Sequence, residues 1–290
     1  MPELPEVETI RRGLRDGGAG YPSLVGEVIS SAQVLWARTL ALPDVAQFCA
    51  RLPGQAISDF GRRGKFLIVY LTQDALLVHL RMSGDLRVES QQQALAPHHR
   101  LVLNFADGLR LAFNDPRKFG RVWLTAQPEE LLAGLGPEPL DGAFTAQDLA
   151  ARMRKRTAPI KAVLLDQTVV AGLGNIYADE VLFAARIDPR RPANSLEHGE
   201  MLRLHAAIRS VLTEAIRAGG AGCRIYGPPL PARAGSREHC RRDRNLRSRV
   251  SQSEAYRANQ ASRRFGYNHL LIQPRGHRYS YQFWLRGQCL

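Results

Sequence analysis

The 290-residue sequence has no apolar run approaching the roughly 18 residues of a membrane-spanning helix, so we expect no membrane span. Its first residues lack the basic and apolar regions of a secretory signal, so we expect a cytoplasmic protein. Cysteine is scarce, and Cys49, Cys223, Cys240 and Cys289 are too scattered to indicate a disulfide framework. No Cys-x-x-Cys pair occurs, so the sequence predicts no closed zinc site.

Acidic residues and lysine are nearly absent from the last quarter of the chain. Residues 219–290 hold 14 Arg, three acids and no Lys, which gives this stretch +11 of the total formal charge of +13. Residues 1–218 carry only +2, so a nucleic-acid role for them must depend on specific side chains. Residues 221–290, the basic tail, show no helical or strand periodicity over most of their length.

Hydrophobic spacing divides the rest of the chain into two parts. Residues 3–16 have the apolar spacing of an amphipathic helix. Between about 24 and 125, short apolar segments alternate with turn residues, which favours a β-sandwich or barrel, and Asp107-Gly108 is a hairpin signal. The clearest predicted strands are 66–71, 75–80, 100–105 and 110–113.

Proline and glycine mark a linker over 126–143, and a helical period follows. The predicted helices begin after Thr145, at Pro159, at Asn175 and after Ser195, the last ending at Gly219-Gly220. We therefore expect an α+β fold with four parts: a β-sandwich domain with flanking helices over 1–125, the linker, a helical domain over 144–220 and the irregular basic tail over 221–290.

Two residues at the start of the chain suggest chemistry. Removal of Met1 would leave Pro2 with a secondary amine, and an α-amino group has a pKa of roughly 7.7–8.0, so part of it is neutral near pH 7. Such an amine can attack the anomeric carbon of a nucleoside and form an iminium. Glu3 is placed to exchange protons with the sugar oxygen or the leaving group. On these residues alone, an ordinary processed terminus is the simpler interpretation.

The wider string changes that balance. Residues 1–9, MPELPEVET, resemble the opening of the formamidopyrimidine-DNA glycosylase family, the bacterial 8-oxoguanine glycosylases, and further matches follow in order over 1–218. Leu4 favours this oxidised-purine branch over the related endonuclease VIII branch, which typically has Gly there. The resemblance implies a β-sandwich followed by a helix-two-turn-helix domain, with DNA in the cleft between them, and makes Pro2 and Glu3 catalytic.

Other motifs carry roles by the same resemblance. GRRGKFL (61–67) matches a segment whose lysine assists base release and β-elimination, which assigns that role to Lys65; alone, such a lysine is usually a solvated charge. HLRMSG (79–84) and NDPRKFG (114–120) match loops that fill the void left by an extruded base. That assigns a wedge to Met82, Arg117 and Phe119, although Met and Phe are more often core residues. The family usually has Gly where Arg81 stands, so Arg81 adds a phosphate contact or crowds the wedge.

The resemblance also makes Arg117 of the wedge a DNA contact and implies three further DNA-contacting residues. PHHR (97–100) partly matches a Lys-His-Asp-His segment and assigns a contact to His98, which is otherwise an exposed turn histidine. Arg156 aligns with a basic contact, or belongs to one solvated helix face. GLGNIYADE (172–180) places backbone N–H groups at a helix start, a natural phosphate seat, and makes Asn175 a phosphate clamp.

The function implied is that of a monomeric glycosylase/AP lyase that acts on damaged double-stranded DNA and requires no cofactor. The family's lesion-covering loop and zinc ribbon, with its four cysteine ligands, are not recognisable after residue 218. Two alternatives remain: a binding protein for damaged or abasic DNA that has lost turnover, and an RNA-associated helical protein, which leaves the N-terminal string unexplained. The basic tail is either an out-of-frame reading of a GC-rich gene or a genuine segment that holds DNA nonspecifically.

Overall fold

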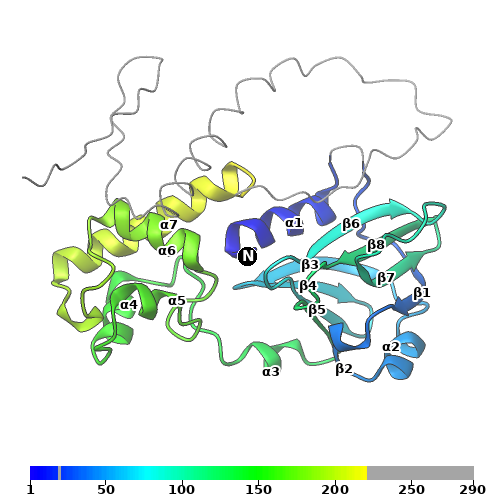
Figure 1. Cartoon of the computed structure of the whole chain (residues 1–290), viewed down its shortest axis with the longest axis horizontal. Helices are drawn as coiled ribbons and strands as arrows, with labels where there is room; N and C mark the ends of the chain where they lie inside the picture. The colour runs from blue at the N-terminus through cyan, green and yellow to red at the C-terminus, as the bar shows by residue number, and fades with distance from the viewer. Residues whose placement is uncertain (19–20, 221–290) are drawn as a thin grey trace, which may run out of the picture. The chain divides into compact units, whose positions relative to one another are not determined.

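The computed structural model describes residues 1–18 and 21–220, so the predictions for the basic tail lie outside the described residues. In the described part, strands form two sheets, of order β1-β7-β8-β6 and β2-β9-β5-β4-β3 (Figure 1). The strands are β1 (Ile29–Val34), β2 (Leu40–Leu42), β3 (Ile57–Arg63), β4 (Phe66–Leu71), β5 (Ala75–His79), β6 (Asp85–Ser90), β7 (His99–Phe105), β8 (Leu109–Asn114) and β9 (Arg121–Thr125).

The two sheets share one hydrophobic core. Leu67 and Val69 of β4 and Leu101 and Leu103 of β7 belong to the same buried cluster, and none is more than 3% exposed. Helix α1 (Leu4–Asp16) adds most of its apolar face to this cluster. The β-sandwich predicted from the apolar periodicity is therefore confirmed.

One helix interrupts the region where only strands were expected. Helix α2 (Val45–Arg51) begins after Asp44, whose side chain accepts a hydrogen bond from the backbone N–H of Gln47 at 2.9 Å. A short 3₁₀ turn, Ala37–Thr39, precedes β2. The hairpin expected at Asp107-Gly108 joins β7 to β8.

The later helices form a second buried cluster that includes Leu149, Ile160, Val181 and Leu204, and Leu4 of α1 belongs to this cluster. Figure 1 shows α4 to α7 as one group, coloured green to yellow. The helices after the sandwich are α3 (Pro128–Leu132), α4 (Ala146–Met153), α5 (Ile160–Leu165), α6 (Asn175–Ala185) and α7 (His198–Arg217). None of the helices in the described ranges is both long and apolar enough to cross a membrane.

The predicted start of the last helix is wrong by a few residues. Ser195 lies in a 3₁₀ turn, Ala193–Ser195, and its hydroxyl donates to the carbonyl oxygen of Pro192 at 2.8 Å. Helix α7 instead begins after Glu197, which forms a capping box with Glu200. Serine and glutamate both offer side-chain oxygens here, and the reciprocal bonds of the glutamate pair fix the helix start two residues later.

Candidate active site

The carboxylate of Glu3 lies at the N-terminus of α6. Its Oε2 accepts hydrogen bonds from the backbone N–H groups of Gly174 (2.7 Å) and Tyr177 (3.2 Å), and its Oε1 accepts one from Ile176 (2.9 Å). The first N–H groups of a helix have no partner within it, so a carboxylate there is held by hydrogen bonds and by the helix dipole. Gly174 permits this approach, because a Cβ there would lie 2.3 Å from Cδ of Glu3.

Further contacts hold the start of α1 against the loop before α6. The N–H of Leu4 donates to the carbonyl oxygen of Gly172 at 3.1 Å. Glu6 accepts from the N–H of Glu3 at 2.8 Å and from the hydroxyl of Tyr177 at 2.7 Å. Pro2, half-buried, directly precedes these anchored residues, so its position is set by the same contacts.

Lys65 reaches the same place from the turn between β3 and β4. Arg63 pairs with Phe66, which leaves Gly64 and Lys65 as a two-residue turn, with Gly64 at a φ of 55°. A Cβ on Gly64 would lie 3.2 Å from Cβ of Ala171, so the turn packs on the loop before α6. The lysine is 7% exposed.

Glu3 and Lys65 influence each other's pKa. Burial lowers the pKa of the Lys65 ammonium; Glu3 opposes this and Arg81 adds to it, and the net direction is down. Burial raises the pKa of Glu3, and the backbone N–H groups of α6 together with Lys65 offset only part of the rise. The structure therefore brings together the three predicted catalytic residues, with the proton affinities of Glu3 and Lys65 moved toward each other.

Met82 and Phe119 are 48% and 49% exposed, so the interpretation of these two as core residues is excluded. They lie on the loops that follow β5 and β8. Fully buried Asp115 ties the two loops together. Its carboxylate accepts hydrogen bonds from three donors: the hydroxyl of Ser83 at 2.5 Å, the N–H of Arg117 at 3.1 Å and the N–H of Gly120 at 2.7 Å.

Each exposed apolar side chain follows a residue with a left-handed backbone. Arg81 has a φ of 55° and Lys118 a φ of 62°, which residues with side chains rarely adopt. The Arg117 guanidinium lies 5.1 Å from the ring centroid of Phe119, and Nζ of Lys118 lies 3.8 Å from that of Trp36. The two loops thus present apolar tips from a fixed backbone, and Trp36 is a support that sequence reasoning missed.

The four predicted DNA contacts, Arg117 among them, fall on exposed positions. The carbonyl oxygen of His98 accepts from the N–H of Asp115 at 2.8 Å, which places His98 beside the two loops. Asn175 is the first residue of α6; the N–H groups beside it, predicted to bind a phosphate, instead hold the Glu3 carboxylate. Arg156 lies after α4 and forms an ion pair with Asp166 at 3.3 Å.

Sequence reasoning also missed His79, the last residue of β5. Its Nδ1 accepts the N–H of Arg81 at 3.1 Å, and its ring meets that of Phe66 edge-on. Burial, Arg81 and Lys65 lower the pKa of His79 to about 4, so the ring is neutral near pH 7. Its sequence signal was its place in HLRMSG, two residues before the arginine that it holds.

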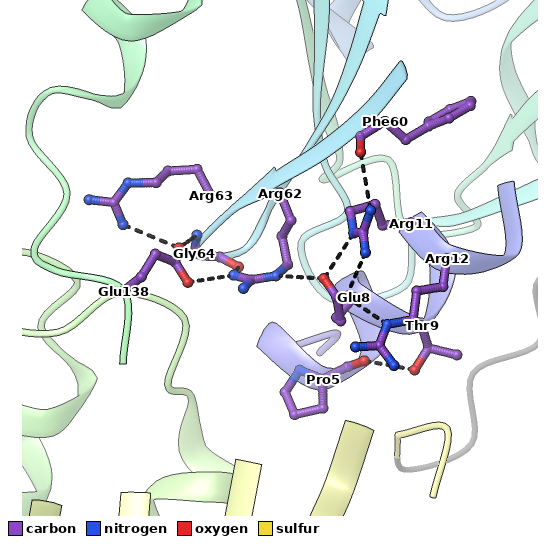
Figure 2. Close-up of polar contacts among 10 residues, drawn as sticks. All are labelled: Pro5, Glu8, Thr9, Arg11, Arg12, Phe60, Arg62, Arg63, Gly64 and Glu138. Carbon is purple, nitrogen blue, oxygen red and sulfur yellow. Dashed lines mark hydrogen bonds and ion pairs between the residues drawn. The ribbon is translucent and has the colours of Figure 1, made fainter. Parts of the chain in front are cut away.

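A polar network around Glu8 was missed as well (Figure 2). Glu8 accepts hydrogen bonds from Arg11 and Arg12 of its own helix and from Arg62 of β3, which also reaches Glu138. The available signal was Glu138 itself, a charged residue between Pro137 and Pro139 in an otherwise apolar stretch.

A metal site finds no support in the described ranges. Within residues 1–18 and 21–220, no group of three or more His, Cys, Asp or Glu side chains is arranged to hold a metal ion. The sequence after residue 220 lacks the Cys-x-x-Cys pairs of a zinc ribbon. The residues present do not fit the family's zinc, and no step proposed below uses one.

Two domain models of one protein family match this chain. The model of the formamidopyrimidine-DNA glycosylase N-terminal domain matches residues 1–122, and that of its H2TH domain matches residues 135–226. The formamidopyrimidine-DNA glycosylase of Moorella thermoacetica is 48% identical over 244 residues, which cover 82% of this chain and 87% of that protein. That of Geobacillus kaustophilus is 47% identical over 231 residues, 78% of this chain and 82% of that one.

Solved structures agree with this. The Lactococcus lactis enzyme in complex with DNA containing N7-benzyl-Fapy-dG has a TM-score of 0.71 at 38% identity, covering 77% of this chain and 82% of that one. The same enzyme bound non-covalently to DNA with an AP site has a TM-score of 0.70 at 38% identity, covering 75% and 83%. The chain belongs to the formamidopyrimidine-DNA glycosylase family.

Proposed function

We propose that the protein excises oxidised purines, 8-oxoguanine and formamidopyrimidines, from duplex DNA and then nicks the strand by β-elimination. The observation that carries this proposal is the meeting of Glu3 and Lys65 beside Pro2 at the N-terminus of α6. The Lactococcus lactis relatives bound to DNA with a modified Fapy-dG or an AP site support lesion-bearing duplex DNA as the substrate.

The chemistry begins with the Pro2 amine, after removal of Met1. Its nitrogen attacks C1′ of the lesion nucleoside and loses its proton, and the bond from C1′ to the base breaks as the base leaves with a proton. The bond from C1′ to the ring oxygen O4′ then breaks, O4′ takes up a proton, and the iminium between Pro2 and C1′ forms. Glu3 exchanges the proton of the sugar oxygen or of the departing base, which its raised pKa favours.

The same iminium then drives strand scission. Loss of a proton from C2′ breaks the bond between C3′ and its phosphate oxygen, and hydrolysis later frees Pro2. Its lowered pKa makes the Lys65 ammonium give up a proton more readily than an ordinary lysine, which suits a group that transfers protons and that, when charged, neutralises a nearby phosphate. This sequence of steps needs no cofactor.

Recognition falls to the loops and helix starts around the site. Met82, Arg117 and Phe119 fill the void of the extruded base, which supplies part of the few kcal/mol lost on unstacking. Exposed His98, Asn175 and Arg156 contact the DNA backbone.

We propose that the protein acts as a monomer in the cytoplasm.

Borohydride reduction tests the central step. It should cross-link the protein to duplex DNA with an abasic site, and mass spectrometry should place the adduct on Pro2. Blocking the terminal amine should abolish the adduct, and an undiminished adduct would reject Pro2.

Lys65→Ala should slow excision of 8-oxoguanine more than nicking of a preformed abasic site, whereas equal losses would contradict this division of roles.

A damaged-DNA binding protein without turnover is the second candidate, favoured by the missing ribbon ligands. It predicts selective binding of the abasic duplex with no borohydride adduct.

A further inference from the structure

Arg62 contacts two distant segments of the chain and its own turn with one side chain (Figure 2). Its Nε donates to Glu8 of α1 at 3.2 Å, and its Nη1 donates to Glu138 of the linker at 2.8 Å. The same Nη1 donates to the carbonyl oxygen of Gly64 at 3.2 Å. The side chain is only 11% exposed, so these contacts lie largely out of water.

The network holds both backbone polar groups of Gly64, the residue before Lys65. The N–H of Gly64 donates to Glu138 at 2.5 Å, while its carbonyl accepts from Arg62. Arg63 strengthens the clamp, since it donates to Glu138 at 3.2 Å and to the carbonyl oxygen of Gly136 at 2.5 Å. With its first residue held at both ends, the turn has little freedom to move the backbone of Lys65.

The network depends on charges that stay ionised. Burial raises the pKa of Glu8, but hydrogen bonds from Arg11 and Arg12 and the charge of Arg62 outweigh it and lower the pKa to about 2. Removing one member of such a group leaves an uncompensated charge in a poorly hydrated place, so its partners must rearrange.

We propose that Arg62 is a positioning residue for Lys65. It fixes the turn that carries the lysine against α1, which Pro2 and Glu3 directly precede, and it contacts no reacting atom itself. The role rests on the proposed function of Lys65, but the place that it fixes is a property of the folded chain with or without DNA.

The test compares Arg62→Met with Arg12→Met in the full-length protein. Arg12 also donates to Glu8, at 2.7 Å, but both residues lie on α1, so this bond joins no separate segments. Single-turnover excision of 8-oxoguanine should fall by roughly 10- to 100-fold in Arg62→Met, as expected for a displaced catalytic group, and change less than about threefold in Arg12→Met. Because Arg62 acts through Lys65, adding Arg62→Met to Lys65→Ala should cause little further loss.

A second readout does not need activity. The chain has four lysines, and exposed Lys155 serves as an internal reference for buried Lys65. Acylation by a small amine reagent, followed by mass spectrometry, should modify Lys65 slowly in the wild type and in Arg12→Met, and at least about fivefold faster in Arg62→Met. If Arg62→Met does not fold, Glu138→Gln carries the same expectations, because its amide oxygen still accepts from Gly64 while the charge facing Arg62 is gone.

The outcomes separate the two proposals. Equal Lys65 acylation in Arg62→Met and Arg12→Met rejects the positioning role, as does full additivity with Lys65→Ala. A wild type that neither excises nor traps DNA rejects the proposed function, and the acylation comparison then decides the role of Arg62 alone.

Discussion

Arg81 is a residue whose backbone and side chain make different demands. Its φ of 55° lies in the region that glycine enters freely, and for a residue with a Cβ this conformation costs about 1–2 kcal/mol. This φ explains why the family that the chain resembles usually has Gly at this position. A single sequence with Arg there does not reveal the backbone conformation. The bond from its N–H to His79 helps to hold it there.

We therefore expect Arg81→Gly to be more stable than Arg81→Ala by about 1 kcal/mol, because only alanine keeps the Cβ. The same pair at Arg87, in strand β6, should show the opposite order by roughly 0.5–1 kcal/mol, since glycine weakens a strand. Urea unfolding of the four variants measures both differences. If the alanine variant is the more stable one at both positions, the backbone of Arg81 is not strained.

Glu8 makes stability depend on pH. Its pKa is about 2 in the folded chain and 4.5 ordinarily, so its contribution is complete above about pH 4.5 and is lost as pH falls toward 2. The shift corresponds to on the order of 3 kcal/mol. Glu8→Gln should thus destabilise the protein at pH 7 and matter progressively less below pH 4.5 in urea titrations. Glu214→Gln, on the exposed face of α7, is the control, and a Glu8→Gln deficit that is constant with pH contradicts the assignment.

At the scale of elements, α6 begins without a side-chain cap of its own. Gly174 occupies the N-cap, and the oxygens that satisfy the first turn come from Glu3, far away in the sequence. The helix therefore positions the carboxylate of Glu3, and the carboxylate in turn stabilises the helix.

Gly174→Ala should break this arrangement, because the new Cβ would lie 2.3 Å from Cδ of Glu3. We expect a loss of stability of about 1–3 kcal/mol from the overpacked site, and slower excision because the carboxylate proposed to exchange protons with the substrate is displaced. Gly142→Ala, where a Cβ meets nothing within 4 Å, is the matched control. Thermal melts and single-turnover assays compare the two; wild-type excision by Gly174→Ala would show that Glu3 need not be held there.

Sequence patterns predicted the elements that carry their own signals. Strand β4 was predicted with its observed ends because an apolar run follows a Gly-Lys turn, and α4 because Thr145 and Asp148 form a capping box. Helix α2 was missed because its seven residues are too short to show a clear period. The pairing of Glu3 with α6 depends on tertiary packing and has no local signal.

At the scale of the whole chain, α1 joins the two cores. Leu4 packs in the helical cluster while Val7 and Ile10 pack in the sandwich, so one helix belongs to both. The positive charge is concentrated at the end of the sequence. Residues 219–290 carry +11 of the +13, whereas every residue assigned to chemistry lies before residue 219.

Deleting residues 221–290 should therefore lower affinity for any duplex and flatten its dependence on salt, because fewer counterions are released on binding. Discrimination between damaged and undamaged DNA should remain almost unchanged. Binding isotherms of full-length protein and of residues 1–220 on both duplexes, across a salt series, measure this. A loss confined to the damaged duplex would show that the tail reads the lesion.

The bond between Glu3 and Gly174 spans 171 residues, and that span bears on how the protein is made. During synthesis the amine end leaves the ribosome first, and its partners at the start of α6 emerge only after most of the chain. Closing so long a loop comes late in folding, after the local strands and helices have formed. On the proposed mechanism, an unfinished or truncated chain has the terminal amine without the Glu3 carboxylate held beside it, so activity requires the completed fold.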